Sequence, residues 1–381
     1  MKVAVYILPS HTVPPHEERI LAPWQLTSEL VDGLVRKGHE VILFAAHGSH
    51  TTARLEDSGV LPTIQTFGKE NPDIYEDQKQ RDALRLFTHM VMVMKQEHIE
   101  IAHIMHDEQY MLPLLTQAPR SYRFVLTFHN PIEGMRKTIV EQLAQLNNCS
   151  LISISNSQRQ GVHGQFFQTV YNGVDMEKFS FGDTIGDHYL TAGRIVAEKG
   201  HADAMKACQG IQPIHIVGEV RPMQEAQSYW NTEIKPFVDG KDVVYISVVN
   251  HHAMSHEFRW AKAFLFPVHW EEPFGLVMIE SMATGTPVIA YARGSVPEVM
   301  KDGVTGYLVN ESPDAICGQW TIKNTGIAGL REAIERIEHM PIDQYRSMRL
   351  ACREHVKQNF SLETMVDAYI AVYASLVRTN K

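Results

Sequence analysis

The feature that most constrains this chain is a repeated alternation of short apolar runs with amphipathic segments. Lys2–Leu8 (KVAVYIL) and Val41–Ala46 (VILFAA) are apolar runs, and between them apolar residues recur at helical spacing from Trp24 to Val35. Gly38 follows at the position of a helix C-terminal cap. Strands that are apolar throughout belong to parallel sheets with helices on both faces. The pattern therefore predicts an α/β fold.

The alternation continues through the first half of the chain and then starts again. In the first half it predicts strands at Ile99–Met105, Phe124–Phe128 and Leu151–Ile154, and helices at Leu84–Met94 and Thr138–Leu146. In the second half it predicts strands at Tyr189–Ala192, Ile214–Val217, Val243–Ile246, Ala263–Phe266 and Pro287–Ala290, and helices at His201–Cys208 and Leu276–Ala283. Ligands of such sheets bind at the carboxyl ends of the strands.

The length and one irregular stretch together predict two domains. A chain of 381 residues is longer than one hydrophobic core usually supports. Residues 170–187 (VYNGVDMEKFSFGDTIGD) are rich in turn-forming residues and lack sustained periodicity, so we place a hinge there. We expect two Rossmann-like domains, residues 1–175 and 176–361, that face each other across a cleft. A last amphipathic segment occupies Leu362–Val377.

Composition excludes several classes of protein. Apolar residues make up 44% and charged residues 21%, which is typical of a globular chain. No stretch reaches about 18 uninterrupted apolar residues, so no membrane span is expected. The N-terminal run lacks the length and cleavage site of a signal peptide, and the four cysteines show no CxxC spacing. A cytoplasmic protein without a disulfide framework is expected.

Charge argues against a nucleic-acid partner. The formal net charge is −9, and no run of Lys and Arg is long enough to form a basic stripe. The even distribution of charge also does not favour a membrane surface. The 20 histidines are scattered and say little about function by themselves.

The most informative segment is residues 269–309, HWEEPFGLVMIESMATGTPVIAYARGSVPEVMKDGVTGYLV. Seven residues separate Glu272 from Glu280, which would place them about 12 Å apart on a helix that starts near Phe274. Gly275 allows close approach of backbone to a ligand, and the N–H groups of Gly275 and Leu276 would suit a phosphate or hydroxyl. The alternative is that both glutamates decorate a surface helix.

This segment resembles the donor-binding signature of the retaining GT-B glycosyltransferases of family four. The shared elements are E-x7-E around an F-G-[LIV] core, a G-x-P-V-I-A…G-x-x-P-E continuation at 285–298, and a D-G-x-x-G turn at 302–306. The resemblance implies that Glu272 holds hydroxyls of the transferred sugar and Glu280 those of the ribose. It also implies donor contacts from Phe274, Gly275 and Leu276.

A second element of the resemblance is TAGRIVAEKG, residues 191–200. Arg194 follows a predicted strand and Lys199 lies five residues further on, so two cations could neutralise a diphosphate. An ordinary charged loop is the alternative. The segment resembles the family's G-R-[LI]-x-x-x-K-G element, which implies that Arg194 and Lys199 hold the leaving diphosphate beside Gly193. Gly218 in Val217–Glu219 resembles a further glycine near the nucleotide.

The amino-terminal half carries a weaker part of the resemblance. His129 in LTFHN ends a predicted strand, and the family often places a histidine there near the transferred sugar. His103 and His106 match a family motif only loosely and are expected to be structural, with His106 a minor candidate. Loop 9–24 lacks the family's Gly-Gly pair, so acceptor or phosphate contacts are assigned to His11, Thr12 and His16. By the same resemblance, residues 362–381 pack back onto the first domain.

No metal or cofactor is expected. His252 and His256 lie four residues apart in HHAMSHEF, but Ala253 stands where an H-E-x-x-H zinc site needs glutamate, and no third ligand is evident. No D-x-D motif is placed to hold a diphosphate through a metal ion. A nucleotide-diphosphate sugar would be a substrate and not a cofactor.

The resemblance implies a metal-independent hexosyltransferase that works with retention, with Glu272, Arg194, Lys199 and His129 as its catalytic residues. Family frequency favours UDP-glucose as donor, and the acceptor could be a saccharide, a lipid-linked intermediate or a small molecule. Two alternatives remain. A dehydrogenase would need G-x-G-x-x-G after a strand, and no predicted strand is followed by one. A non-catalytic nucleotide-sugar-binding protein would keep the same binding residues.

Overall fold

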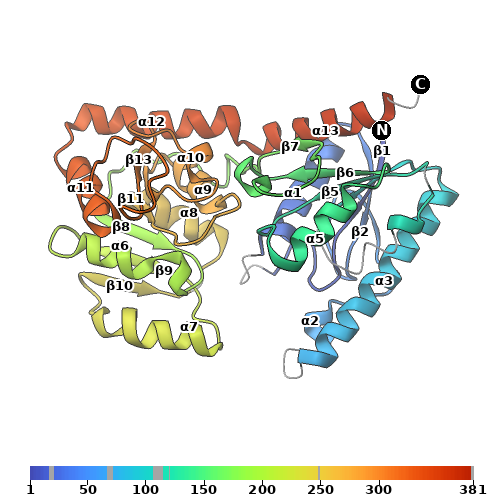
Figure 1. Ribbon diagram of the computed structural model, residues 1–381, viewed down its shortest axis with the longest axis horizontal. Helices are drawn as coiled ribbons and strands as arrows, with labels where there is room; N and C mark the ends of the chain where they lie inside the picture. The colour runs from blue at the N-terminus through green and yellow to red at the C-terminus, as the bar shows by residue number, and fades with distance from the viewer. Residues whose placement is uncertain (17–20, 67–71, 106–114, 120, 248, 379–381) are drawn as a thin grey trace. The chain divides into compact units, whose positions relative to one another are not determined.

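The computed structural model describes residues 1–16, 21–66, 72–105, 115–119, 121–247 and 249–378. The chain divides into two compact units, one formed by Met1–Asn172 together with Leu362–Lys381 and the other by Gly173–Ser361. The expected boundary followed residue 175, whereas the observed division follows Asn172. Each unit is an α/β structure built on a parallel sheet (Figure 1).

The first unit contains a seven-stranded sheet in the order β3-β2-β1-β4-β5-β6-β7. Its strands are β1 (Lys2–Tyr6), β2 (Glu40–Phe44), β3 (Arg54–Glu56), β4 (Ile101–Ile104), β5 (Arg123–Thr127), β6 (Cys149–Ser153) and β7 (Gln168–Thr169). Its helices include α1 (Ala22–Arg36), α2 (Thr63–Thr66), α3 (Pro72–Gln96), α5 (Gly134–Leu143) and α13 (Leu362–Arg378). Each of the strand pairs is parallel.

The second unit contains a six-stranded parallel sheet in the order β10-β9-β8-β11-β12-β13. Its strands are β8 (His188–Ala192), β9 (Ile214–Val217), β10 (Val243–Ile246), β11 (Ala261–Phe266), β12 (Val288–Tyr291) and β13 (Gly306–Val309). Its α-helices include α6 (His201–Cys208), α7 (Gln224–Tyr229), α8 (His251–Trp260), α9 (Leu276–Ala283), α10 (Val296–Val299), α11 (Gly326–Glu338) and α12 (Ile342–Asn359). Single turns of 3₁₀ or π helix occupy Ser157–Arg159, Ala197–Lys199, Trp230–Ile234 and Lys235–Phe237.

The strand order identifies the edge of each sheet where a ligand would bind. In the first unit the order reverses beside β1, which pairs with both β2 and β4, and in the second it reverses beside β8, which pairs with β9 and β11. Ligands of doubly wound sheets bind outside the carboxyl ends of the strands at such a reversal. The segments that follow β1, β8 and β11 therefore lie where chemistry is expected.

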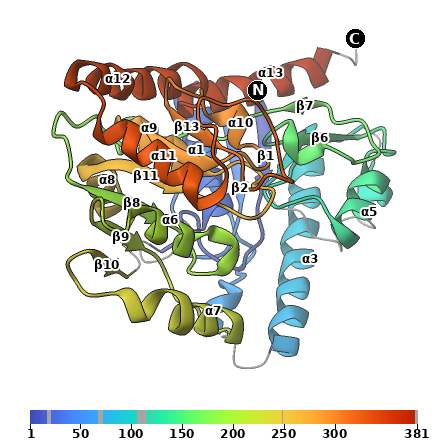
Figure 2. The same ribbon diagram turned by 60° about the vertical axis from the view of Figure 1, so that its left-hand side comes forward.

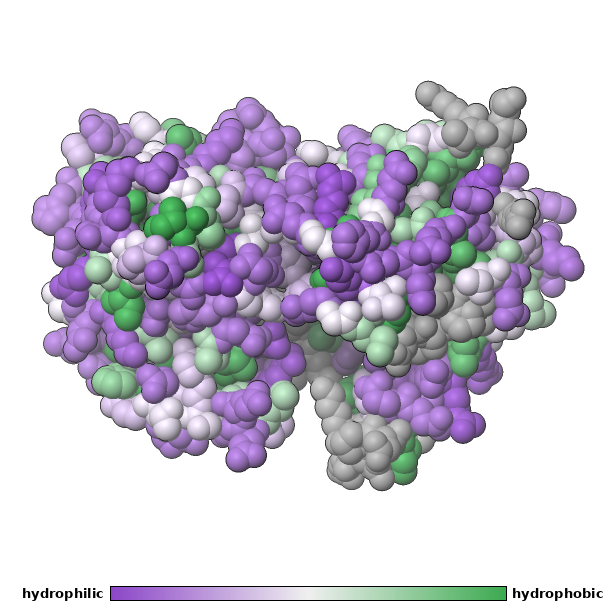
Figure 3. Space-filling model, viewed as in Figure 1, coloured by the Kyte–Doolittle hydropathy of each residue, from purple (hydrophilic) through white to green (hydrophobic). Residues whose placement is uncertain are grey.

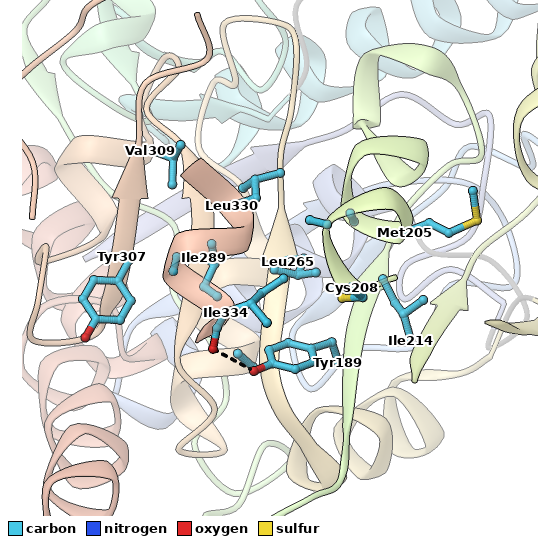
Figure 4. Close-up of a cluster of buried hydrophobic side chains, with 14 of the residues drawn as sticks. Tyr189, Met205, Cys208, Ile214, Leu265, Ile289, Tyr307, Val309, Leu330 and Ile334 are labelled. Carbon is cyan, nitrogen blue, oxygen red and sulfur yellow. Dashed lines mark hydrogen bonds between the residues drawn. The ribbon is translucent and has the colours of Figure 1, made fainter. Parts of the chain in front are cut away.

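The core of the second unit explains why its strands are apolar. Side chains from alternate strand positions, such as Tyr189, Ile214 and Leu265, pack under α6 and α11 (Figure 4). On the opposite face, Phe264 of β11 contacts Phe258 of α8, with ring centroids 5.3 Å apart. Helices therefore cover both faces of the sheet, as Figure 2 shows, and neither face can carry polar alternation.

The last helix, α13, packs in the first unit against α1. A Cβ at Gly33 of α1 would come within 2.6 Å of a Val366 methyl group, so the helices meet without room for a side chain there. Lys37 forms an ion pair with Asp367 at 2.8 Å. These contacts fix α13 to the first unit.

A buried polar network also joins α13 to the sheet. His103 of β4 is fully buried, with Nδ1 2.6 Å from the Tyr373 hydroxyl and Nε2 2.8 Å from the Thr127 hydroxyl. Thr127 also lies 2.9 Å from the Tyr369 hydroxyl. Burial lowers the pKa of His103 to about 3, so the imidazole is neutral and each ring nitrogen has a partner. His103 is therefore structural, as expected, whereas His106 lies outside the described residues.

The visible surface is predominantly hydrophilic. On the face drawn in Figure 3, hydrophobic side chains appear in small separate groups among hydrophilic ones. Among the described residues, no helix combines the length and apolar character needed to cross a bilayer.

Candidate functional site

The loop after β8 carries the first group of predicted site residues, and two glycines determine its path. A Cβ on Gly218 would collide with the carbonyl oxygen of Gly193, so this loop and the end of β9 approach more closely than any side chain allows. Gly193 has φ +148°, a backbone conformation that favours glycine. Both glycines were predicted to bind the donor, and the structure shows an additional, steric reason for glycine at these two positions.

His201 holds the same loop in place through two hydrogen bonds. Its ring lies between two partners: Nδ1 is 3.0 Å from the Thr191 hydroxyl, and Nε2 is 3.0 Å from the carbonyl oxygen of Arg194. Because a carbonyl only accepts, Nε2 donates and Nδ1 accepts from the hydroxyl. Burial lowers the pKa of His201 to about 4, which keeps this neutral arrangement. His201 opens the predicted helix His201–Cys208, but nothing in the sequence pattern indicated its positioning role.

Lys199 and Glu272 meet in the structure although they lie 73 positions apart in the sequence. The Lys199 Nζ donates to Glu272 Oε2 at 2.8 Å, and both side chains are largely buried, with 13% and 10% exposure. Lys199 stands at the end of the loop after β8, and Glu272 on the loop after β11. A cation and a carboxylate from two neighbouring strand ends therefore share one spot at the expected edge of the sheet.

Trp270 is a third member of this group, and it was not among the predicted site residues. Its indole Nε1 donates to Glu272 Oε2 at 2.9 Å, and its ring lies 4.3 Å from Lys199 Nζ. The indole thus supplies both a hydrogen bond to the anion and a π face to the cation. Trp270 precedes the first glutamate of the E-x7-E pattern and belongs to no motif element, so spacing gave no signal for it.

The backbone of the Glu272 loop is held by its neighbours. Ser295 N–H donates to the Glu272 carbonyl at 2.9 Å, and a Cβ on Gly294 would collide with the Glu272 backbone. Glu271 accepts hydrogen bonds from Gly294 N–H at 2.6 Å and from Arg293 Nε at 2.7 Å. The G-x-x-P-E part of the motif therefore serves to support the first glutamate.

Helix α9 begins at Leu276, the start of the predicted range Leu276–Ala283, and not near Phe274, the start assumed for the separation of the two glutamates; Gly275 precedes it with φ +79°. Glu272 therefore lies on the loop before the helix, and the separation of about 12 Å along a helix, predicted for Glu272 and Glu280, does not apply. Glu280 itself lies within α9 and is buried. Phe274 is buried against Phe360, with ring centroids 5.9 Å apart, so it acts in packing.

Arg194 does not share the partners of Lys199. Its guanidinium donates to Glu198 at 3.1 Å, and its side chain is 39% exposed. The two predicted cations thus differ: Lys199 is enclosed and oriented, whereas Arg194 is a half-exposed side chain paired with a neighbour on the same loop. The turn at 302–306 is also structural, because Asp302 accepts hydrogen bonds from the N–H groups of Leu308 and Thr321.

The predicted residues of the first unit lie near two strand ends. His129 follows β5 and is half-buried. In the loop after β1, the His11 ring packs edge-on against Trp24 at 5.0 Å. The Thr12 hydroxyl donates to the Pro14 carbonyl at 3.0 Å, and His16 is exposed. Residues 17–20 of this loop lie outside the described part.

The comparisons with known proteins concern the family and the fold. The family model of glycosyl transferases group 1 matches residues 186–319, and that of glycosyltransferase family 4 matches residues 25–178. An uncharacterized 41.2 kDa protein in the cps region of Klebsiella pneumoniae is 30% identical over 138 residues. That alignment covers 36% of this chain and 34% of the relative, so the chain matches only about a third of that protein's length.

Two solved structures share the fold over nearly the whole chain. Sucrose-phosphate synthase from Thermosynechococcus elongatus has a TM-score of 0.75 at 17% identity and covers 100% of both chains. HepE of Anabaena in complex with UDP-glucose has a TM-score of 0.69 at 14% identity, covering 98% of this chain and 99% of that one. The motifs, the two doubly wound units and the two family models lead to one conclusion: the chain belongs to the GT-B glycosyltransferases of family four.

Proposed function

We propose that this protein is a retaining glycosyltransferase that moves a hexose from a nucleotide-diphosphate sugar, UDP-glucose, to a saccharide, lipid-linked or small-molecule acceptor. The observation that carries the proposal is the enclosed group of Lys199, Glu272 and Trp270 at the strand ends of the second unit. The choice of UDP-glucose is supported by family frequency and by the fold shared with HepE in complex with UDP-glucose.

In this proposal the ion pair is a site prepared for the donor. Lys199 has three N–H donors, and Glu272 accepts one of them. The remaining donors would bind the diphosphate, while the second oxygen of Glu272 would accept from sugar hydroxyls. Arg194, which is half-exposed, would turn from Glu198 to the diphosphate. Glu280 would hold the ribose hydroxyls from within α9, and the first N–H groups of α9 would face the phosphate.

The reaction would proceed by attack on the same face from which the leaving group departs. The bond from the anomeric carbon to the diphosphate oxygen breaks, and its electron pair stays on the phosphate. The acceptor oxygen bonds to the anomeric carbon, and its proton passes to the departing phosphate oxygen. Lys199, Arg194 and the helix-start amides stabilise the charge that develops on the diphosphate. A double displacement would need a second carboxylate about 5 Å from the first, and the sequence indicates none.

The first unit would supply the remaining roles. His129 would act near the transferred sugar, and His11, Thr12 and His16 would contact the acceptor; these assignments are supported by the resemblance and by their place after β5 and β1. Because the diphosphate would be neutralised by side chains, we propose that transfer does not require a metal ion. We propose a cytoplasmic location, since the cysteines Cys149, Cys208, Cys317 and Cys352 are all free thiols.

The test compares Lys199→Ala and Glu280→Ala with Lys206→Ala, which changes an exposed lysine on α6 in the same unit. Calorimetry would measure binding of UDP, GDP and ADP, and a coupled assay would measure transfer and hydrolysis from a panel of nucleotide sugars. Lys199→Ala should lower the transfer rate by about a hundredfold or more, Glu280→Ala should weaken nucleotide binding, and Lys206→Ala should change neither. Unchanged rates in both site variants would contradict the assignment.

The same assay separates the alternative of a non-catalytic binder. An enzyme of this kind hydrolyses its donor slowly when no acceptor is present, because water reaches the activated anomeric carbon. Wild-type protein that binds UDP-glucose but releases no glucose above the Lys199→Ala background would support the binding protein instead.

A further inference from the structure

Two histidines and a glutamate from three separate elements converge at the end of the second sheet opposite the predicted donor site. His188 opens β8, His215 is the second residue of β9, and Glu257 lies in the last turn of α8. Because Leu190 pairs with His215 in the sheet register, His188 and His215 project from the same face, the one that α8 covers. None of the three belongs to the donor-binding motifs.

The distances within this group are short. The two imidazole rings stack with centroids 3.8 Å apart and an interplanar angle of 20°. The Nδ1 of His215 lies 3.2 Å from Glu257 Oε2. One ligand atom from each residue falls within 4.8 Å of the others, and among the residues that the structure describes this is the group that could hold a metal ion.

His188 provides an independent indication of a missing ligand. The side chain of His188 is 10% exposed, and its Nε2 is buried without a hydrogen-bond partner. Its Nδ1 lies 3.3 Å from Asp187 Oδ1, so the carboxylate fixes the proton on Nδ1 and leaves the lone pair on Nε2. A histidine whose far nitrogen donates to a carboxylate is the usual arrangement of a metal-binding imidazole. Leaving that lone pair buried and unpaired would otherwise cost stability.

The chemistry of the ligands selects the cation. Two imidazole nitrogens and one carboxylate suit zinc and similar first-row divalent ions, whereas calcium and magnesium prefer oxygen ligands. We propose that His188, His215 and Glu257 form a binding site for one zinc-type divalent ion that joins α8 to the N-terminal ends of β8 and β9. The fourth ligand would be water.

Binding requires a small local adjustment. In a tetrahedral zinc site with bonds of about 2.0–2.1 Å, neighbouring ligand atoms lie about 3.3–3.5 Å apart. The present atoms are spread over up to 4.8 Å, so the ligands must draw together and the stacked rings must tilt until their lone pairs converge. His215 and Glu257, whose side chains are 24% and 20% exposed, have the freedom to make this movement, while His188 is the fixed partner.

The test titrates Zn²⁺ into tag-free protein previously treated with a chelator, because a polyhistidine tag would bind the metal itself. Calorimetry should give one Zn²⁺ per chain, and thermal unfolding should shift upward when one equivalent is added. Co²⁺ should give visible absorption bands from a nitrogen-containing site of low symmetry. These readouts do not depend on transfer activity, so they fail or succeed independently of the proposed function.

Variants decide which residues bind. Glu257→Gln, His215→Gln and His188→Gln should each weaken Zn²⁺ binding more than tenfold and remove the thermal shift. His252→Gln is the matched control, because it changes an exposed histidine on the same helix outside the group. Zinc binding in Glu257→Gln and His215→Gln equal to wild type would overturn the proposal, as would a wild-type chain that binds no zinc. Should His188→Gln fail to fold by circular dichroism, the other two variants carry the test.

Discussion

The two units share one architecture and differ in the loop after their central strand. In each sheet the first strand, β1 or β8, lies beside the reversal of strand order, so the next loop occupies the expected ligand edge. After β8 this loop contains Gly193, Arg194 and Lys199, and Lys199 meets Glu272 in an enclosed ion pair. After β1 the loop contains no glycine, and its described polar contacts involve neutral groups such as the Thr12 hydroxyl.

We propose that this difference adapts one fold to two kinds of ligand. Glycines let the backbone approach a ligand closely, and fixed charges suit a diphosphate, so in this proposal the second unit binds an anion. The described residues of the loop after β1 instead present imidazole, hydroxyl and proline groups, and we propose that they bind a neutral polyhydroxyl compound. The fold therefore determines where a ligand binds, and the side chains after the central strand determine which ligand it is.

The largest expected effect comes from removing the negative charge of Glu272 in the second unit. Glu272→Gln keeps the volume of the side chain but leaves Lys199 without its anionic partner. We expect the transfer rate to fall by a factor of about 10²–10³, as for other preorganised electrostatic groups. Steady-state kinetics with UDP-glucose would measure it, with Glu225→Gln on the exposed side of α7 as the control. A fall in the transfer rate of less than threefold would mean that the charge of Glu272 does not distinguish the second unit from the first.

The next effect tests the close approach that the glycines allow. Gly218→Ala places a Cβ on the Gly193 carbonyl oxygen, so the backbone must move, and we expect a loss of about 3 kcal/mol in the free energy of unfolding. Gly210→Ala is the matched control in the same unit: its φ of +75° costs about 1–2 kcal/mol, but the added Cβ meets nothing within 4 Å. Urea unfolding would compare the two. Equal losses would show that the contact between Gly218 and Gly193 is not limiting.

A third effect compares the two buried histidines through pH. The pKa is lowered from 6.5 to about 3 for His103 in the first unit and to about 4 for His201 in the second. Between these pKa values and 6.5 the unfolded chain binds more protons than the folded chain. The free energy of unfolding is therefore highest above pH 6.5 and falls as the pH decreases. Each histidine should lower the free energy of unfolding by up to about 2 kcal/mol between pH 6.5 and 5.

Hydrogen exchange followed by mass spectrometry would resolve this loss unit by unit, because it reports on peptides of each sheet separately. His103→Gln should flatten the pH dependence of exchange in β4 and β5 and leave β8 and β9 unchanged. If the pH dependence of exchange in the first unit were as steep in this variant as in the wild type, the expectation would be contradicted.

Much of the fold could be predicted from the sequence, because apolar strands and amphipathic helices are local signals. The bounds of β9, β10, α6 and α9 match the predicted ranges. The short edge strands β3 and β7 were not predicted, since strands of two or three residues give little periodicity. No range was predicted for α11, although its buried residues Leu330, Ile334 and Ile337 recur at helical spacing. The separation of about 12 Å between Glu272 and Glu280 assumed a helix that starts near Phe274, whereas α9 starts at Leu276 after Gly275 in the αL conformation, so Glu272 lies outside the helix.

The site was less predictable because its contacts are non-local. Spacing identified Lys199 and Glu272 separately, but only the sheet order places the ends of β8 and β11 side by side. Trp270 and His201 act through that arrangement and carry no motif of their own. In α8 the sequence suggested His252 and His256 as metal-ligand candidates. The residue of α8 that meets His188 and His215 is instead Glu257, which directly follows His256. Tertiary pairing of distant elements is what the sequence could not supply.

The smallest expected effect lies in the first unit, and it tests the neutral side of the comparison. His11→Ala removes a ring that packs edge-on against Trp24. If this loop binds a neutral acceptor through a few hydrogen bonds, loss of one such contact is worth about 0.5–1.5 kcal/mol, so KM for the acceptor should rise about two- to tenfold. The dissociation constant for UDP should not change, and neither should the salt dependence of donor binding, because His11 would contact the acceptor and not the diphosphate. Glu272→Gln should show the reverse pattern, with kcat falling and acceptor KM little affected. A His11→Ala variant that weakened UDP binding as strongly as Lys199→Ala would show that the loop after β1 also contacts the anion, and the division of ligands between the two units would then have to be abandoned.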